Sequence, residues 1–399
     1  MHAEKLCHKW LSNVMPGMHR RRLVALCAVV GSALRGGQLT VTGLGRSLSG
    51  PAKIKHSIKR ADRLFSNTHL HSERIDMYRH LSHQMIGSTK QPIILVDWSD
   101  IDARRKFFLL RAAVAVKGRS LTLYEEIHTR ATREKPKTHA QFLKNLKSVL
   151  PKDCRPIIVT DAGFRTPWFR QVLALEWDYV GRVRNRDMVQ LCQNSAWIGA
   201  KTLYARATTK AKLIKNISLT RSNTLVCSLI LFKGKPKGRK RITKMGSNAK
   251  SRTSLVNSKR AREPWLLATS LSDEQVTEKH VVKVYSSRMQ IEESFRDLKC
   301  PRFGLSLYHN GTYKIERMRI LILIGSIANT FAWLLGKVAR TLHVHRQYQA
   351  NTTTSSNVLS NVFIGNQIFR ESQLKIPWSS FMKSIAHLKL FQINTANRT

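Results

Sequence analysis

Two aspartates of this chain lie where their side chains could bind a divalent metal ion together. Asp97 and Asp161 each stand at the end of an apolar run that predicts a buried β-strand, in ILVDWSD and IVTDAGF. In an α/β sheet, ligands bind at the edge formed by the carboxyl ends of the strands. Two carboxylates at such an edge repel each other unless a cation separates them, and a pair of Mg²⁺ ions is the usual solution for a phosphodiester substrate. A third carboxylate would complete the metal site.

A candidate for the third carboxylate lies in the segment YSSRMQIEESFRDLK, residues 285–299. If this segment is one helix at about 100° per residue, four of its side chains share a face within an arc of about 60°. They are Tyr285, Arg288, Glu292 and Lys299. The other acids of the segment lie further round the helix. Glu292 is therefore predicted to hold metal, while the two cations on its face bind the phosphates that the metal also engages.

These assignments have structural alternatives. Glu292 could belong to an exposed helix held by ion pairs with Arg288 and Arg296, which stand at helical spacing from it. Asp97 and Asp161 could instead cap the loops that follow their strands. On spacing alone the structural alternatives are the more common case. The conjunction of three acids with the charge of the whole chain favours catalysis.

The chain is strongly basic. It has 399 residues, 69 Lys and Arg against 24 Asp and Glu, and a formal net charge of +45. Such a charge repels itself unless a polyanion helps to neutralise it, and nucleic acid is the first candidate. An anionic membrane surface is the competing partner. The longest uncharged run, between Arg319 and Lys337, contains small and polar residues and predicts a buried helix. With no apolar signal-peptide core before the N-terminal basic cluster, a cytosolic location and no membrane partner are expected.

The elements that must position the acids follow an α/β order between residues 89 and 184. Strands are predicted in the segments 92–100, 106–118, 119–129, 155–164 and 178–184. Helices are predicted at 138–150 and at 166–177, the second capped by Thr166 with Pro167 at its first position. Three strands, a helix, a strand, a helix and a strand is the order of an RNase H-like α/β sheet, in which the first and fourth strands are neighbours.

A helical, basic region precedes the predicted sheet. In IKHSIKRADRLF, the apolar residues Ile54, Ile58, Ala61 and Phe65 recur at helical spacing and predict one buried stripe. The other faces carry cations that would contact DNA, or would only form a solvated basic face: Lys55, Lys59, Arg60 and Arg63. The preceding stretch 39–53 predicts a short helix and a Gly/Pro turn. The two together could form a helix-turn-helix-like unit.

A mostly β insertion and a helical C-terminal region complete the predicted organisation. The polar, basic stretch 233–260 cannot bury a core and is expected to be a mobile loop or arm, and a helix is expected from about Glu274 to Lys299. The predicted parts are a helical DNA-binding domain (1–88), the first part of the RNase H-like core (89–184), the inserted β subdomain with its basic loop (185–275), the glutamate helix of the core (276–310) and the helical C-terminal region (311–399).

The three acidic segments together resemble the catalytic motifs of DDE cut-and-paste transposases from bacterial insertion sequences, specifically the insertion sequence 4 family. That family has the signature Y-x2-R-x3-E-x6-K, and this chain matches it at Tyr285, Arg288, Glu292 and Lys299. The length, the helical N-terminal region and the β insertion before the glutamate helix resemble the insertion sequence 10 subgroup. The resemblance covers nearly all of the chain.

The resemblance implies roles for single residues. Asp97, Asp161 and Glu292 would form a metal-binding triad for two Mg²⁺ ions per active site, which Mn²⁺ could replace. Tyr285, Arg288 and Lys299 would hold the DNA backbone beside the cleaved bond. Trp265 would stack on a base flipped from the duplex, although it could equally be a core tryptophan of the insertion.

The resemblance also implies a reaction and its partners. The substrates would be double-stranded DNA with inverted terminal repeats and a target DNA, and a homodimer would pair the ends in a synaptic complex of a bacterial, nucleoid-associated protein. The reaction would comprise strand cleavage, hairpin formation and strand transfer. Two alternatives stay open at this point: a non-catalytic DNA-binding protein, and an RNase H-like nuclease without strand transfer.

Overall fold

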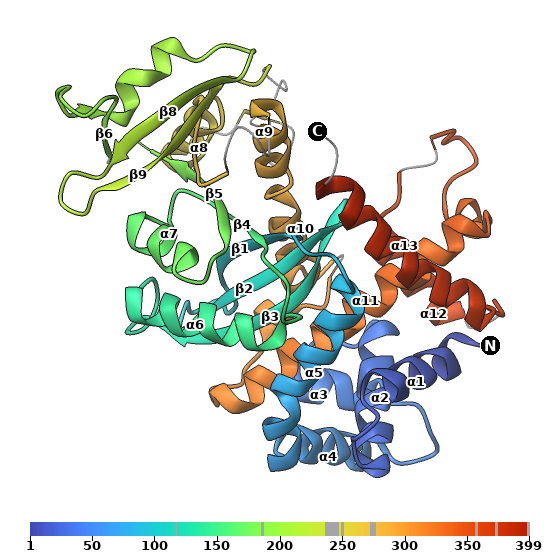
Figure 1. Cartoon of the computed structure of the whole chain (residues 1–399). Helices are drawn as coiled ribbons and strands as arrows, with labels where there is room; N and C mark the ends of the chain where they lie inside the picture. Colours follow the sequence, from blue (N-terminus) through green and yellow to red (C-terminus); the bar gives the residue numbers. More distant parts are fainter. Residues whose placement is uncertain are drawn as a thin grey trace. The chain divides into compact units, whose positions relative to one another are not determined.

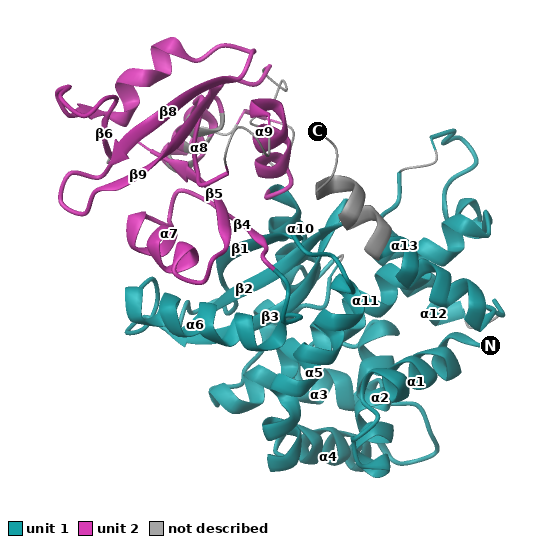
Figure 2. Ribbon diagram, viewed as in Figure 1, with its two compact units in different colours: residues 1–154, 289–397 teal, residues 155–288, 398–399 magenta. Residues whose placement is uncertain are grey.

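In a computed structural model the chain forms two compact units, and each unit contains both helices and strands (Figure 2). Unit 1 comprises Met1–Cys154 and the described residues from Met289 onward, and unit 2 comprises the described residues of Arg155–Arg288. The structure describes residues 1–116, 118–184, 187–235, 247–248, 251–271, 277–302, 304–355, 358–371 and 374–396. The predicted mixed α/β class is confirmed, and the predicted domain boundaries stay a prediction.

Unit 1 is built on an antiparallel sheet in the spatial order β3-β2-β1 (Figure 1). Its strands are β1 (Ile93–Asp100), β2 (Phe107–Val116) and β3 (Arg119–Thr129), each inside a segment that the sequence predicts as strand. Its helices are α1 (Ala3–Val14), α2 (Arg20–Leu34), α3 (Val41–Arg46), α4 (Ile54–Phe65), α5 (Thr68–Ile86), α6 (Pro136–Val149), α10 (Met289–Lys299), α11 (Ile315–Thr341), α12 (Asn361–Glu371) and α13 (Trp378–Ala396), with short 3₁₀ turns at η2 (Leu307–His309) and η3 (Val344–Tyr348).

Helix α11 is the core of unit 1. It is long and apolar enough to cross a membrane by length and composition, with a mean hydropathy of 1.7 over its most apolar window, yet 89% of that window is buried inside the protein. Aromatic rings surround it: the ring of Phe331 lies 5.5 Å from that of Trp10 on α1 and 5.6 Å from that of Phe381 on α13. The buried helix predicted between Arg319 and Lys337 is thus confirmed.

Helices α3 and α4 are in close contact at a glycine. A Cβ atom at Gly45 on α3 would lie 2.5 Å from the Cα of Ile58 on α4, so the two helices approach closely only because residue 45 is glycine. Ala61 and Phe65 are buried as predicted, whereas Ile54 is 62% exposed. The prediction for Ile54 is wrong: this residue is the first of α4, and its side chain is exposed there.

Unit 2 contains one mixed sheet in the order β4-β5-β10-β9-β8-β6-β7. Its strands are β4 (Ile157–Thr160), β5 (Asp178–Val183), β6 (Met188–Gln190), β7 (Ile198–Gly199), β8 (Lys212–Leu219), β9 (Leu225–Phe232) and β10 (Trp265–Thr269). Its helices are α7 (Thr166–Leu173), α8 (Arg252–Ala261) and α9 (Glu278–Ser286), with the 3₁₀ helix η1 (Ala200–Arg206). Strand β10 pairs antiparallel with both β5 and β9, so the β-rich segment continues the sheet that begins with the parallel pair β4 and β5.

Two local predictions in unit 2 need correction. The N-cap of α7 is Arg165 rather than Thr166, whose hydroxyl instead lies 2.7 Å from the hydroxyl of Thr220. The polar stretch 233–260 is not loop throughout, because α8 occupies its C-terminal part. Residues 236–246 and 249–250 of that stretch lie outside the described residues. The predicted mobility of the basic arm therefore stays a prediction.

Candidate active site

Asp97 lies inside β1 rather than at its end. The pairing of β1 with β2 continues as far as Asp100, which lies opposite Phe108, so β1 ends with the predicted segment 92–100 and Asp97 lies three residues before that end. Asp97 is 9% exposed, and its Oδ1 accepts a hydrogen bond of 2.8 Å from the backbone nitrogen of Trp98. Residues before and after Asp97 both pair with β2, so the pairing of the strand fixes the position of Asp97.

Asp97 belongs to a row of charged residues across the unit 1 sheet. It lies opposite Arg111 on β2, which in turn lies opposite Glu125 on β3. Residues that are directly opposite in an antiparallel sheet project from the same face. Glu125 Oε1 accepts further hydrogen bonds from the hydroxyls of Tyr78 on α5 (2.9 Å) and Ser326 on α11 (2.7 Å). The carboxylate of Glu125 therefore has several donors as well as its arginine.

A β-bulge brings small hydroxyl side chains to this same face. The register shifts between Ala112 and Ala113, which lie opposite Tyr124 and Thr122 and leave Leu123 as the extra residue. Thr122 thereby shares its face with Glu125, although the two are an odd number of residues apart. The Thr122 hydroxyl lies 3.3 Å from that of Ser326 on α11.

Helix α10, which carries Glu292, is fixed to this face by polar contacts. The hydroxyl of Ser294 lies 3.1 Å from that of Ser120 on β3, and Asp297 accepts a bond of 2.6 Å from Arg119 Nε. Glu292 lies in the first turn of α10 and is exposed. Arg296, the alternative ion-pair partner of Glu292, is instead paired with Glu293, whose carboxylate lies 3.3 Å from Arg296 Nη1.

Lys299, at the other end of α10, reaches β1 beyond Asp97. Its Nζ lies 2.9 Å from Ser99 Oγ and 3.7 Å from the carboxylate of Asp100. Unit 1 therefore brings three of the predicted site residues onto one strand and one helix that are packed together: Asp97, Glu292 and Lys299.

The single helix predicted through residues 285–299 is wrong. Helix α9 ends at Ser286 and α10 begins at Met289. The hydroxyls of Ser286 and Ser287 each donate to a backbone carbonyl of the last turn of α9, at 2.6 Å, and such local bonds favour the end of a helix. The predicted shared face of the four signature residues therefore does not exist as one helical stripe, and the signature spans a turn instead.

Tyr285 and Arg288, on the α9 side of that turn, belong to unit 2 with Trp265. The ring of Trp265 lies 4.9 Å from that of Tyr285 and 5.8 Å from that of Phe232. Trp265 is half-buried at the start of β10, and Tyr285 is 4% exposed. Burial raises the pKa of the Tyr285 phenol, while the positive charge of Arg288 and its hydrogen bond to this phenol oppose the rise in pKa.

Asp161 also belongs to unit 2 and follows β4 directly, as predicted. Its Oδ1 accepts a hydrogen bond of 2.8 Å from the backbone nitrogen of Gly163, and the residue is half-buried. Its negative charge is one of the causes that raise the pKa of Tyr285. Unit 2 therefore brings four of the predicted residues into one neighbourhood: Asp161, Trp265, Tyr285 and Arg288.

Comparison with known proteins now decides the family. A family model described as "Transposase DDE domain" matches residues 88–327, which is more than half of the chain. The chain belongs to the DDE transposase family. It is accordingly an enzyme, a polynucleotidyl transferase and endonuclease that acts on DNA with divalent metal ions. No curated protein matches the sequence.

The acids of this transposase suit a hard divalent cation by their chemistry. Asp97, Asp161 and Glu292 offer only carboxylate oxygens, which Mg²⁺ and Mn²⁺ prefer over nitrogen or sulfur ligands. Asp97 and Glu292 belong to unit 1, and Asp161 belongs to unit 2. Within either unit alone, the described residues hold no group of three Asp, Glu, His or Cys side chains at metal-binding distance.

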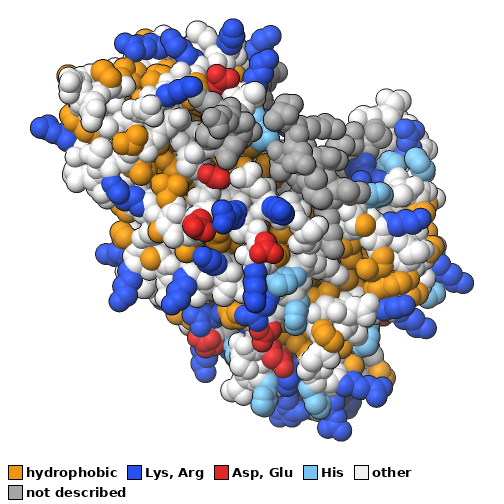
Figure 3. All heavy atoms as spheres, viewed as in Figure 1, with side chains coloured by type: hydrophobic (Ala, Val, Ile, Leu, Met, Phe, Trp, Pro, Cys, Tyr) orange, Lys and Arg blue, Asp and Glu red, His pale blue; other side chains and the backbone are white. Residues whose placement is uncertain are grey.

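The N-terminal cations predicted to bind DNA lie on α4 of the transposase, outside the matched segment. All four are exposed: Lys55, Lys59, Arg60 and Arg63. Lys and Arg side chains also occur over the visible face of both units (Figure 3). Exposure is compatible with DNA contact and equally with the solvated face that the sequence left open.

Some residues of these neighbourhoods were missed by the sequence analysis. Arg111 and Glu125 support the strand of Asp97, and Arg182 on β5 lies in the electrostatic surroundings of Tyr285. Burial lowers the pKa of Arg182, and the carboxylate of Glu263 lies 3.9 Å from its guanidinium. The signal that could have found the arginines is a single cation inside an apolar strand, in FFLLRAAVAV and in DYVGRV.

Proposed function

We propose that this transposase moves an insertion sequence by cut-and-paste transposition, through strand cleavage, hairpin formation and strand transfer at inverted terminal repeats. The family match over residues 88–327 carries the proposal, because this segment contains all of the predicted acidic motifs. The spacing of the last motif supports the narrower assignment to the insertion sequence 4 family and its insertion sequence 10 subgroup. Family membership favours an enzyme over the non-catalytic DNA-binding alternative.

Asp97, Asp161 and Glu292 are the proposed ligands of two Mg²⁺ ions, which Mn²⁺ could replace. Bound divalent ions would polarise the phosphodiester and lower the pKa of the attacking water or 3′-hydroxyl. Three observations support these ligands: all are carboxylates, Asp97 is held rigidly within β1, and Glu292 is exposed on a helix that packs against that strand.

The signature cations and phenol are proposed to hold the DNA backbone. Lys299 places its ammonium next to Ser99, two residues along β1 from Asp97, where it would attract a phosphate oxygen. Arg288 would bind phosphate through its forked guanidinium. Because burial raises the pKa of Tyr285, its phenol stays protonated at neutral pH and would donate a hydrogen bond.

The proposed partners are the terminal repeats, a target DNA and a second copy of the chain in the synaptic complex. The exposed cations of α4 would contribute to binding the ends. The +45 charge of the chain supports a polyanionic partner.

Metal-dependent cleavage of a plasmid that carries the DNA flanking the reading frame tests the proposed ligands. Asp97→Asn, Asp161→Asn and Glu292→Gln are each expected to reduce Mg²⁺-dependent cleavage by at least about 10³-fold, because metal assistance contributes several kcal/mol. Glu293→Gln on the same helix and the exposed Asp153→Asn are matched controls that should cleave normally. Cleavage near the wild-type rate in any one acid variant would remove that residue from the metal site.

The same reaction separates a transposase from a nuclease on the same fold. Joining of the cleaved 3′ ends to an unrelated target plasmid is expected for the transposase. Cleavage without any joined product, under conditions where both DNAs are bound, would favour the nuclease.

A further inference from the structure

The turn between β1 and β2 in unit 1 carries three exposed cations in a row. They are Arg104, Arg105 and Lys106, and no predicted motif includes them. The turn follows β1, in which Asp97 lies three residues before the end of the strand at Asp100. Three residues of a strand span about 10 Å, so the turn begins close to one of the proposed metal ligands.

The backbone of this turn is anchored by Asp102, which is buried. Oδ1 of Asp102 accepts hydrogen bonds of 2.9 Å from the backbone nitrogens of Lys106 and Phe107. Arg105 has a φ of 50°, in the left-handed region, and its backbone nitrogen donates to Asp102 O at 3.1 Å. Glycine adopts such a φ more readily than any residue with a Cβ atom. The turn therefore presents an exposed arginine at a position where the backbone favours glycine.

An exposed tyrosine that is distant in sequence lies against these cations. Tyr313, in the segment before α11, is 58% exposed. Its ring centroid lies 5.4 Å from the guanidinium carbon of Arg104 and 5.3 Å from Lys106 Nζ, and its hydroxyl accepts a hydrogen bond from Arg104. Cations are attracted to an aromatic ring at such distances, so Tyr313 orients both side chains on the surface. We call Arg104, Arg105, Lys106 and Tyr313 the turn cluster.

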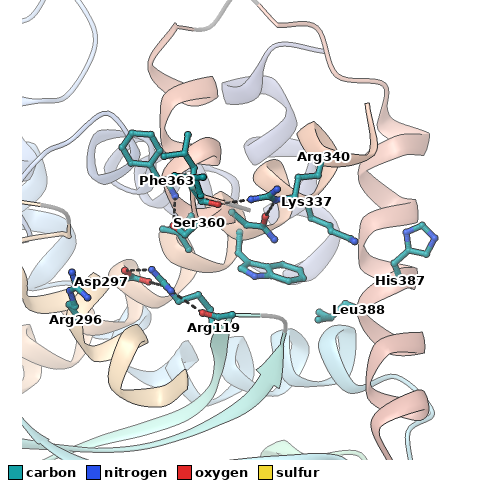
Figure 4. A pocket seen from close by; sticks show the side chains of 15 residues that line it. Arg119, Arg296, Asp297, Lys337, Arg340, Ser360, Phe363, His387 and Leu388 are labelled. Carbon is teal, nitrogen blue, oxygen red and sulfur yellow. Dashed lines mark hydrogen bonds and ion pairs between the residues drawn. The ribbon is translucent and has the colours of Figure 1, made fainter. Parts of the chain in front are cut away.

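The positive charge of the turn cluster has no carboxylate partner in the part of the chain that the structure describes. The nearest exposed acid in sequence, Asp100, lies 3.7 Å from Lys299 instead. Elsewhere in unit 1 an arginine commonly has its own carboxylate. Arg119 binds Asp297 beside the cavity between α10, α11, α12 and α13, for example (Figure 4). The turn cluster thus differs in leaving its charge available to an anion from outside the protein.

We propose that the turn cluster binds phosphates of the donor DNA beside the cleaved bond, where donor DNA means the duplex that carries the inverted repeats. The inference rests on the proposed function, which makes DNA the substrate. Arg and Lys side chains donate to phosphate oxygens, and side chains already oriented by an aromatic ring lose less conformational entropy on binding. Because the turn begins about 10 Å from Asp97, the bound phosphates would lie within a few nucleotides of the cleaved bond. Target DNA offers the same phosphates and is the alternative ligand.

Binding of the full chain to a duplex that spans the cleaved bond, without divalent metal and at several salt concentrations, tests the proposal. Arg104→Gln combined with Lys106→Gln should weaken binding about tenfold to 100-fold at about 0.1 M salt. It should also make the log–log salt slope less steep by about 1.8, because each lost phosphate contact changes the slope by about 0.9. Lys144→Gln combined with Lys147→Gln removes the same charge from the exposed face of α6 and is the matched control, which should change the slope less. Equal changes of slope in the two double variants would overturn the proposal.

Arg105→Gly separates a binding role from a structural one. Glycine adopts the left-handed φ of this position more readily, so the melting temperature should stay the same or rise. DNA binding should nevertheless weaken about threefold to tenfold, with a salt slope less steep by about 0.9. Wild-type binding and a wild-type salt slope in Arg105→Gly would contradict the proposed contact.

Single methylphosphonate groups, each of which removes the charge of one phosphate, locate the contact on the DNA. Those within a few nucleotides of the cleaved bond should weaken binding of the wild type and have little further effect on the Arg104→Gln and Lys106→Gln double variant, because both changes remove the same contact. Additive losses at every position would overturn the proposal. So would normal binding of donor DNA with reduced strand transfer, because the turn cluster would then bind target DNA. Since binding is measured without metal, failure of cleavage and joining in the wild type would count against the proposed function and not against this site.

Discussion

Arg111 and Glu125 form an ion pair with almost no exposure to solvent. Their side chains are 1% and 0% exposed, and Arg111 Nη2 lies 2.7 Å from Glu125 Oε2. The guanidinium also lies 5.1 Å from the ring of Phe295 on α10, while β1 places Asp97 opposite the same arginine. The pair therefore supports both the strand and the helix that carry the proposed metal ligands of unit 1.

Removing one charge of this pair should destabilise the protein strongly. Glu125→Ala leaves a buried guanidinium without its carboxylate and is expected to lower the free energy of unfolding by about 3–5 kcal/mol. The double variant Arg111→Met/Glu125→Leu should lose much less than the sum of the single losses, because neither member of the pair then remains buried without the other. Urea unfolding of the single and double variants measures the difference.

The control for this cycle is an exposed pair. Asp76→Asn breaks the ion pair of Asp76 with Arg79, whose side chains are 58% and 37% exposed, and should change stability by about 1 kcal/mol or less. Additive losses in the Arg111 and Glu125 cycle would show that the two side chains are not energetically coupled.

His139 should make the stability of the protein depend on pH. The indole nitrogen of Trp98 donates to His139 Nε2 at 3.2 Å, which requires a neutral imidazole, and burial lowers the pKa of His139 to about 4. Nearby His128 adds to this lowering, and His128 itself lies 3.1 Å from Glu126. Between pH 6.5 and 4 the unfolded chain binds a proton at this position that the folded chain does not.

Stability should therefore fall as the pH is lowered from 6.5 to 4, by up to about 3 kcal/mol from this group alone. His139→Gln keeps an acceptor for Trp98 but cannot titrate, so its free energy of unfolding should change less over the same range. The exposed His80→Gln is the control and should follow the wild type. Equal slopes for His139→Gln and the wild type, from urea unfolding at several pH values, would exclude His139 as the cause.

The strands of the candidate site could be predicted from the sequence, whereas the turn between Tyr285 and Glu292 could not. A short apolar run rich in β-branched residues, such as IILVD, favours a buried strand, and Asp161 follows its strand at the predicted residue. The turn depends on the hydroxyls of Ser286 and Ser287 bonding to the backbone, and helical spacing does not register this local competition.

Tertiary contacts account for the other differences. Ile54 is exposed at the first residue of α4 although it continues the apolar spacing, and the burial of Arg111 follows from partners on β3 and α11. A hydrophobic pattern describes one helix or strand at a time. It could not show which other element packs against that helix or strand.

The cations of α4 should contribute to DNA affinity through phosphates. Lys55→Gln combined with Lys59→Gln is expected to make the log–log salt slope of duplex binding less steep by about 1.8, because each lost phosphate contact changes it by about 0.9. Neutralising Lys144 and Lys147, two exposed cations of α6, gives a control with the same loss of charge. If both double variants changed the slope equally, the cations of α4 would belong to the solvated face that is the alternative to DNA contact.

Trp265 should stack on a DNA base if its half-exposed ring serves the proposed hairpin step. The ring is supported by Tyr285 and Phe232, so one face or edge remains for a ligand. Trp265→Ala should reduce hairpin formation by about fivefold to 150-fold, since stacking on a base contributes about 1–3 kcal/mol, whereas Trp265→Phe should retain most of it. The fluorescence of a 2-aminopurine base at the cleaved end rises when the base leaves the duplex, and this rise should be smaller with Trp265→Ala than with the wild type. Trp197→Ala, at another half-buried tryptophan of unit 2, is the control, and equal effects of the two alanine variants would identify Trp265 as a packing residue only.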